Sequence, residues 1–99
     1  MKMETLQFEW DENKNEKNKV KHKISFEEAE TVFYDEDAVI ITDPEHSQDE
    51  ERFIILGFSS RVRLLMVCHC YRSEEMTIRI ISARKATREE TKQYNDREE

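Results

Sequence analysis

Arginine is concentrated in the second half of this chain of 99 residues. Seven of the eight arginines follow residue 60, and the segment from Arg61 to Arg88 carries seven basic residues against two acidic ones, a local charge of +5. A guanidinium group stays charged throughout the physiological pH range, and its planar fork donates hydrogen bonds in pairs to phosphate oxygens. The segment therefore has side chains suited to RNA phosphates, although a single surface arginine is more often a solvated charge.

A predicted strand over residues 62–71 divides part of this segment into two faces, because successive side chains of a strand point to opposite sides. One face carries apolar and thiol side chains, namely Val62, Leu64, Met66, Cys68 and Cys70. The other face carries Arg61, Arg63, His69 and Tyr71. If the apolar face is buried, the second face meets solvent, and its mixture of basic and aromatic groups is typical of RNA-binding surfaces.

Cleavage of RNA without a metal needs one group that takes the proton of the attacking 2′-hydroxyl, another that protonates the leaving oxygen, and cations that stabilise the phosphate. We predict Arg63 and Arg84 as the leading phosphate ligands; Arg84 ends a strand just before a helix N-cap at Thr87, where free N–H groups also favour an anion. Tyr94 is predicted to donate to the phosphate or to transfer a proton, and Arg88 is a weaker catalytic candidate. The predicted RNA-binding residues are Arg61, His69, Arg72 and Arg79.

The sequence does not assign the general base. His69 and Glu51 are candidates, whereas His22 and His46 are more readily explained as hydrogen-bonding groups of loops and helix ends. The Cys-His-Cys run over residues 68–70 suggests a metal site, but strand alternation places its imidazole and its thiols on opposite faces. We therefore predict no metal and no cofactor, and we interpret the thiols as buried apolar groups.

The net charge of −7 hides a strongly acidic segment. Residues 27–51 carry eleven acidic residues and no Lys or Arg, so we expect this segment to attract a basic protein partner. No apolar run approaches the roughly 18 residues of a membrane-spanning helix. The first residues lack the apolar region of a secretory signal, and the two cysteines are too close on one strand to form a disulfide. We expect a cytoplasmic protein with no membrane partner.

Local patterns predict one α+β domain over residues 1–99, with helices on one side of a small antiparallel sheet. The helices are capped by Asp11 and by two capping boxes, one formed by Ser25 and Glu28 and the other by Thr87 and Glu90. The predicted helices cover residues 12–22, 25–34 and 87–97. The predicted strands cover residues 6–10, 38–42, 53–58, 62–71 and 77–83.

Several short strings occur together and in one order along residues 8–95. They are Phe8-Glu9-Trp10-Asp11, Lys21-His22, Ser25-Phe26-Glu27-Glu28-Ala29, the loop 43–47, Glu51-Arg52-Phe53, Arg63-Leu64-Leu65, Arg79-Ile80-Ile81-Ser82-Ala83-Arg84 and Tyr94. In this combination the chain resembles the BrnT family, the ribonuclease toxins of type II toxin–antitoxin pairs. The resemblance implies a RelE-like fold with two N-terminal helices, a small antiparallel sheet and a C-terminal helix.

The same resemblance implies cleavage of RNA, arrest of translation and neutralisation by a BrnA-type antitoxin. It also implies a hetero-oligomer in which only the antitoxin binds operator DNA. A second interpretation is a non-catalytic binding module that acts only as the partner of such an antitoxin. The net charge of −7 favours this second interpretation, because it repels RNA at long range.

Overall fold

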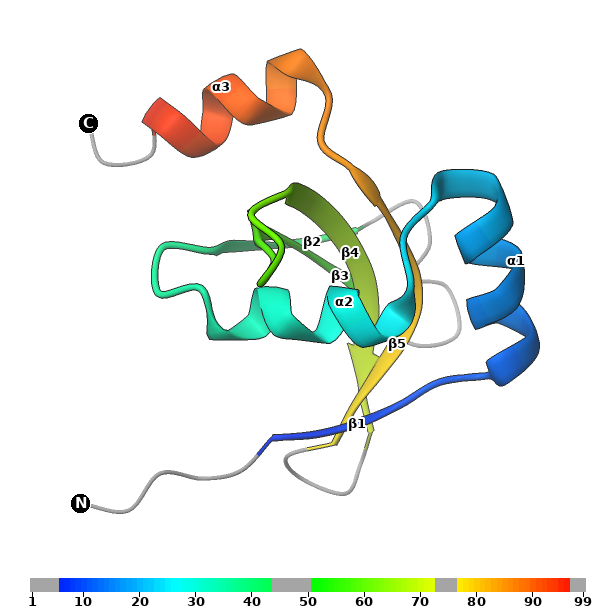
Figure 1. The fold of residues 1–99 in the computed structure, drawn as a ribbon. Coiled ribbons are helices and arrows are strands. Elements are labelled where there is room, and N and C mark those ends of the chain that lie inside the picture. The colour runs from blue at the N-terminus through cyan, green and yellow to red at the C-terminus, as the bar shows by residue number, and fades with distance from the viewer. Residues whose placement is uncertain (1–5, 44–50, 73–76, 97–99) are drawn as a thin grey trace.

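The computed structural model describes residues 6–43, 51–72 and 77–96 and has an α+β fold (Figure 1). This confirms the predicted fold class, and the predicted order of elements differs only by one added 3-10 helix, η1. His46, which we interpreted as a hydrogen-bonding group of a loop, lies outside the described residues. The elements in chain order are β1 (Gln7–Glu9), α1 (Glu12–His22), α2 (Phe26–Glu30), η1 (Thr31–Tyr34), β2 (Val39–Thr42), β3 (Phe53–Phe58), β4 (Leu64–Tyr71), β5 (Thr77–Lys85) and α3 (Arg88–Asp96).

The five strands form one sheet in the order β1-β5-β4-β3-β2. Strands β2 to β5 pair antiparallel, as predicted, whereas β1 pairs parallel with β5 and makes the sheet mixed. Strand β4 begins at Leu64 rather than Val62, because Val62 has a positive φ of 62° in the β3–β4 turn. That turn is closed by 2.9 Å hydrogen bonds that Ser59 N–H donates to Arg63 O and Val62 N–H donates to Ser59 O.

The predicted cap at Asp11 and the capping box of Thr87 and Glu90 are confirmed, whereas the capping box of Ser25 and Glu28 is formed only in its Ser25 half. Asp11 accepts hydrogen bonds from the N–H groups of Asn13 and Lys14, and Ser25 Oγ accepts one from Glu28 N–H at 3.0 Å. The capping box of α3 is reciprocal: Thr87 N–H donates to Glu90 Oε1 at 2.8 Å and Glu90 N–H donates to Thr87 Oγ1 at 3.1 Å. In α2, by contrast, the Glu28 carboxylate binds the β3–β4 turn through Ser59 and Arg63.

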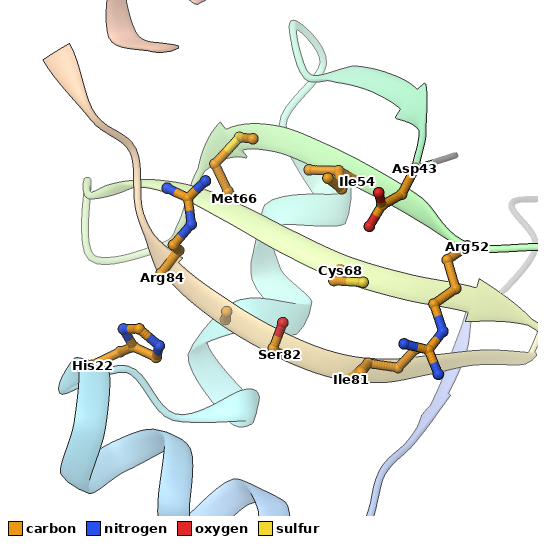
Figure 2. Close-up of a pocket in the computed structure, with 10 residues that line it drawn as sticks. His22, Asp43, Arg52, Ile54, Met66, Cys68, Ile81, Ser82 and Arg84 are labelled. Atoms are coloured by element: carbon orange, nitrogen blue, oxygen red, sulfur yellow. The ribbon is translucent and has the colours of Figure 1, made fainter. Parts of the chain in front are cut away.

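The core lies between one face of the sheet and the layer formed by α2 and η1, while α1 lies along β5 (Figure 1). The sheet contributes the buried residues Ile55, Leu65, Val67, Ile80 and Ala83, and the segment 24–32 contributes Ile24, Phe26, Ala29 and Val32. The other face of the sheet is not covered by α1 or α2 (Figure 2). No helix within the described ranges is long and apolar enough to span a membrane.

Helix α1 is held by amides instead of an apolar face, since its Val20 is 74% exposed. Asn18 is buried; its Nδ2 donates to Ile24 O at 2.8 Å and to Ala83 O at 2.9 Å, and its Oδ1 accepts from Ala83 N–H at 3.2 Å. Strand β1 pairs only with residues 77–79 of β5. Beyond the end of β1, the Asn18 side chain makes hydrogen bonds with the backbone of Ala83 at the edge of β5, where a neighbouring strand would otherwise pair.

The predicted orientation of β4 is wrong for residues 64–69, whereas Cys70 is buried and Tyr71 is 49% exposed, as predicted. Leu65, Val67 and His69 face the core, while Met66 and Cys68 face the uncovered side of the sheet. Both alternating sets of this strand contain apolar side chains, so alternation alone could not tell which set the helices cover. His69 therefore does not lie on a solvent face.

Candidate functional site

The uncovered face of the sheet carries a pocket of about 370 Å³ (Figure 2). Its lining comes from strands β3, β4 and β5, from the end of α1, and from the residues directly after β2 and directly before β3. This lining consists of His22, Asp43, Arg52, Ile54, Met66, Cys68, Ile81, Ser82, Ala83 and Arg84. A volume near the lower end of the range for ligand sites fits a group of roughly nucleotide size, not a duplex.

Charged groups lie at the two ends of this pocket (Figure 2). Arg84 and His22 lie at one end, Arg52 and Asp43 at the other, and Cys68 with Ser82 lies between them. The floor carries the apolar side chains of Ile54, Met66 and Ile81. The pocket thus combines two cations and an imidazole with an apolar floor.

A bulge in β5 shapes the floor. Cys68 pairs with Ser82 and His69 with Ile80, so Ile81 is the extra residue between two ladder positions. Because the extra residue breaks the alternation, Ile81 and Ser82 both line the pocket although they are consecutive. Bulges commonly redirect side chains at functional sites in this way.

Arg84, a predicted phosphate ligand, lies in the pocket and is held by α3. Its Nη1 and Nη2 each donate to one oxygen of Glu90 at 2.9 Å, and Nη1 also donates to Lys85 O at 3.2 Å. The hydrogen bonds from Arg84 and Thr87 lower the pKa of Glu90 to about 2, and the carboxylate in turn raises the pKa of Arg84. Both groups are therefore charged at every pH at which the protein is expected to work.

Arg63, the other predicted phosphate ligand, lies outside the pocket. Its Nε donates to Glu28 Oε2 at 3.0 Å, its Nη2 donates to Glu28 Oε1 and its Nη2 also donates to Lys23 O at 3.3 Å. The buried Glu28 accepts a further bond from Ser59 Oγ at 2.6 Å, and the Arg63 hydrogen bonds lower the pKa of Glu28. These contacts join α2 to the β3–β4 turn, so the structure places Arg63 in the scaffold.

The predicted catalytic residues of α3 also lie outside the pocket lining. Tyr94 is 5% exposed; its hydroxyl donates to Asp35 Oδ2 at 2.8 Å, and its ring packs edge-on against Phe58 at 5.3 Å. Tyr94 therefore fastens α3 to the rest of the domain. Arg88 is exposed in the first turn of the same helix.

The prediction that His69 faces solvent is wrong. His69 is 0% exposed; its Nδ1 lies 3.1 Å from Val67 O and its Nε2 lies 3.2 Å from the Tyr71 hydroxyl. Its ring packs edge-on against Phe33 at a centroid distance of 4.7 Å. Burial lowers the pKa of His69, so the ring stays neutral in the core and does not contact RNA.

The remaining predicted RNA-binding arginines lie at two other places. Arg72 and Arg79 both bind Glu9 Oε2, at 2.7 and 3.0 Å, at the β1 edge of the sheet. Arg61 is exposed in the β3–β4 turn. Of the predicted site residues, only Arg84 lies in the pocket, and the others lie at separate places around the domain.

The pocket contains four polar side chains that the sequence did not select as site residues: His22, Asp43, Arg52 and Ser82. His22 and Arg52 belong to the short strings that carry the family resemblance, which was the available signal. Among the described residues no group of three or more His, Cys, Asp or Glu side chains is arranged to hold a metal. Burial raises the pKa of Cys68, so its thiol is a poor nucleophile at neutral pH.

The chain is thus a small α+β protein of three helices and five strands, with a pocket on one sheet face that is lined by two arginines, a histidine and an aspartate. Residues 10–90 match the family described as "Ribonuclease toxin, BrnT, of type II toxin-antitoxin system". The chain therefore belongs to the BrnT family, which confirms the resemblance seen in the sequence. Its class of function is that of a ribonuclease toxin, and its class of partner is an antitoxin.

A solved structure supports the same fold. The chain is similar to the 1.1 Å crystal structure of the Brucella abortus ribonuclease toxin BrnT, with a TM-score of 0.63 and 21% sequence identity. The match covers 85% of this chain and 100% of the Brucella chain. No protein in the curated set that was compared matches this chain.

Proposed function

We propose that the pocket is the site at which this toxin cleaves RNA, without a metal ion, by attack of a 2′-hydroxyl on the adjacent phosphate. The observation that supports this proposal is the placement of Arg52, Arg84 and His22 around one concave site. Two guanidinium groups are suited to a phosphate, and a neutral imidazole has one nitrogen that can accept a proton and another that carries one.

In this reaction the 2′-oxygen forms a bond to phosphorus while the bond from phosphorus to the 5′-oxygen breaks. The products are a 2′,3′-cyclic phosphate and a 5′-hydroxyl. The phosphodiester keeps its single negative charge, and the proton that the 2′-hydroxyl loses is balanced by the proton that the 5′-oxygen gains. His22 takes the 2′-proton or returns a proton to the 5′-oxygen, with water as the second proton carrier. Arg84 and Arg52 stabilise the negative charge that builds on the phosphate, and the apolar floor receives the ribose or base.

Residues of the predicted site that lie elsewhere receive other roles in this proposal. Arg88 and Arg61 are exposed and are available to contact RNA on either side of the cleaved nucleotide. Arg63 and Tyr94 hold the elements that surround the pocket. Arg72 and Arg79, both bound to Glu9, stabilise the β1 edge.

In the cell, we propose that the cleavage inhibits translation and that a BrnA-type antitoxin neutralises it within a hetero-oligomer, the antitoxin alone contacting operator DNA. The exposed acidic residues Glu27, Glu36 and Asp37 lie on and just after the α2–η1 layer, across the sheet from the pocket. A basic antitoxin segment bound there would need to reach around the sheet edge to cover the pocket. Antitoxin binding that is unchanged after neutralisation of these three acids would contradict this assignment of the partner surface.

The test of catalysis uses purified protein, an RNA oligonucleotide and an excess of EDTA. We expect cleavage with cyclic phosphate ends, and a loss of roughly 100-fold or more for Arg84→Ala, Arg52→Ala and His22→Ala. Lys14→Ala, an exposed change on α1, is the matched control. Cleavage that needs added Mg²⁺ would contradict the metal-free reaction. A folded protein that binds its antitoxin but never cleaves RNA would instead support the non-catalytic binding module.

A further inference from the structure

The contact between Arg84 and Glu90 joins the pocket to α3. The carboxylate of Glu90 binds the end of the guanidinium, with one oxygen on Nη1 and the other on Nη2, both at 2.9 Å. Such a two-point contact fixes the plane of the guanidinium as well as its position. A third bond, from Nη1 to Lys85 O at 3.2 Å, uses the remaining proton of that nitrogen.

This arrangement leaves the other side of the guanidinium available. The Nε–H and the outer proton of Nη2 point in the same direction, and among the described residues neither Nε nor that side of the group has a hydrogen-bond acceptor. Two parallel N–H groups are the fork that binds two oxygens of one phosphate. Glu90 therefore occupies the edge that a phosphate does not need and orients the edge that it does.

Glu90 is itself fixed by the fold. Its Oε1 also accepts a hydrogen bond from Thr87 N–H, so the carboxylate belongs to the capping box that begins α3. About one turn further along, Tyr94 attaches the same helix to Asp35 and Phe58. The orientation of Arg84 thus depends on where α3 lies, although no residue of α3 lines the pocket itself.

We propose that Glu90 is a positioning residue of the cleavage site, which holds Arg84 so that its Nε–Nη2 edge receives the scissile phosphate. This inference rests on the proposed function of the pocket. It makes α3 part of the active site through a carboxylate that never touches RNA. The opposite arrangement, in which Glu90 competes with the phosphate for the same guanidinium, predicts faster cleavage when the Glu90 charge is removed.

The test is a double-mutant cycle of Glu90→Gln and Arg84→Ala, with Glu89→Gln as the matched control. Gln retains an oxygen that can accept from Thr87 N–H, so the helix cap survives while the charge is lost. Glu89 lies in the same helical turn, is exposed and makes no ion pair among the described residues, so its substitution removes the same charge from the same turn of α3. Thermal unfolding of every variant is measured alongside cleavage to separate folding from positioning.

We expect Glu90→Gln to lower kcat roughly 10- to 100-fold while KM changes less than about threefold, since a misdirected catalytic group affects the transition state more than the bound substrate. In the Arg84→Ala background the same change should alter cleavage less than about twofold, because Glu90 acts only through Arg84. Glu90→Asp, which keeps the charge, should recover part of the lost rate. Glu89→Gln should cleave like the wild type.

Three results would overturn the positioning role: equal effects of Glu90→Gln in both backgrounds, a rate for Glu90→Gln equal to that of Glu89→Gln, or faster cleavage by Glu90→Gln. An oligonucleotide with 2′-O-methyl groups, which cannot be cleaved, provides a separate readout. If wild-type protein does not cleave, the affinity for this oligonucleotide is compared among the wild type, Glu90→Gln, Arg84→Ala and the double variant, and this comparison decides whether Glu90 acts through Arg84. Failure of wild-type protein to bind it at all would refute the pocket assignment as well.

Discussion

Substitution of Asn18 by Ala is expected to destabilise the domain strongly. Asn18 is 7% exposed and makes three hydrogen bonds, two from Nδ2 to Ile24 O and Ala83 O and one from Ala83 N–H to Oδ1. Each such bond contributes about 0.5–1.5 kcal/mol net, and buried backbone groups left without a partner cost more. We therefore expect a loss of about 2–4 kcal/mol in the free energy of unfolding.

A loss of this size is a large fraction of the ~5–15 kcal/mol that a small domain possesses. It corresponds to a fall in Tm of roughly 10–25 °C for a chain of this length. Urea unfolding followed by the fluorescence of Trp10 measures the change. Asn13→Ala is the matched control, because this asparagine is exposed on the same helix and its side chain makes no hydrogen bond among the described residues.

The same substitution should also reduce RNA cleavage at temperatures where the variant is still folded. Asn18 lies one helical turn before His22, and its partner Ala83 directly precedes Arg84, so this amide fixes two of the proposed catalytic groups relative to each other. Stability of Asn18→Ala within about 0.5 kcal/mol of the Asn13→Ala control, which is the usual range of surface changes, would refute the reasoning.

Three further outcomes are expected. Gly57→Ala should lower stability by about 1–3 kcal/mol in urea unfolding, because a Cβ there would lie 2.9 Å from Ala38 Cβ and 3.0 Å from Val32 Cγ1; stability equal to that of the parent would contradict this. Tyr94→Phe should lower the free energy of unfolding by about 1 kcal/mol through the lost hydrogen bond to Asp35, and it should keep most of the cleavage rate. A large loss of rate without a loss of stability would instead support the prediction that Tyr94 is catalytic. Arg84 lowers the pKa of Glu90 to about 2, so the contribution of Glu90 to stability is complete above the ordinary Glu pKa and is lost as pH falls through about 2. Between pH 4 and pH 2 the free energy of unfolding should therefore fall less steeply in Glu90→Gln than in the parent protein. Parallel curves of the two proteins would contradict the pairing.

The elements of the fold could be predicted from the sequence because their signals are local. Ser25 and Thr87 cap helices through contacts that span three residues, so the printed sequence already contains both partners. The docking of α1 could not be predicted in the same way. Its apolar pattern is weak, and Asn18 acts on Ala83, which is 65 residues away in the chain.

The candidate site was predicted less well than the fold, for a related reason. Strand β4 is apolar on both faces, so the choice of its buried face depends on which side α2 and η1 cover, and this is a tertiary property. Arg84 was found because it combines a strand end with a helix cap. His22 and Arg52 enter the pocket from distant elements, and apart from the short family strings nothing in the sequence around them indicates that they meet.

The structure also changes how the charge of the chain is understood. Four of the predicted arginines are already paired with carboxylates: Arg63 with Glu28, Arg72 and Arg79 with Glu9, and Arg84 with Glu90. The local charge of +5 therefore overstates the attraction for RNA, as the net charge of −7 overstates the repulsion. Exposed charges more than ~10 Å apart are largely screened at physiological salt. In the pocket an RNA phosphate is attracted by the positive charges of Arg52 and Arg84, and this attraction is reduced by the negative charges of Asp43 and Glu90. The Nε–Nη2 edge of Arg84 is the donor whose direction is fixed, because Glu90 holds the guanidinium.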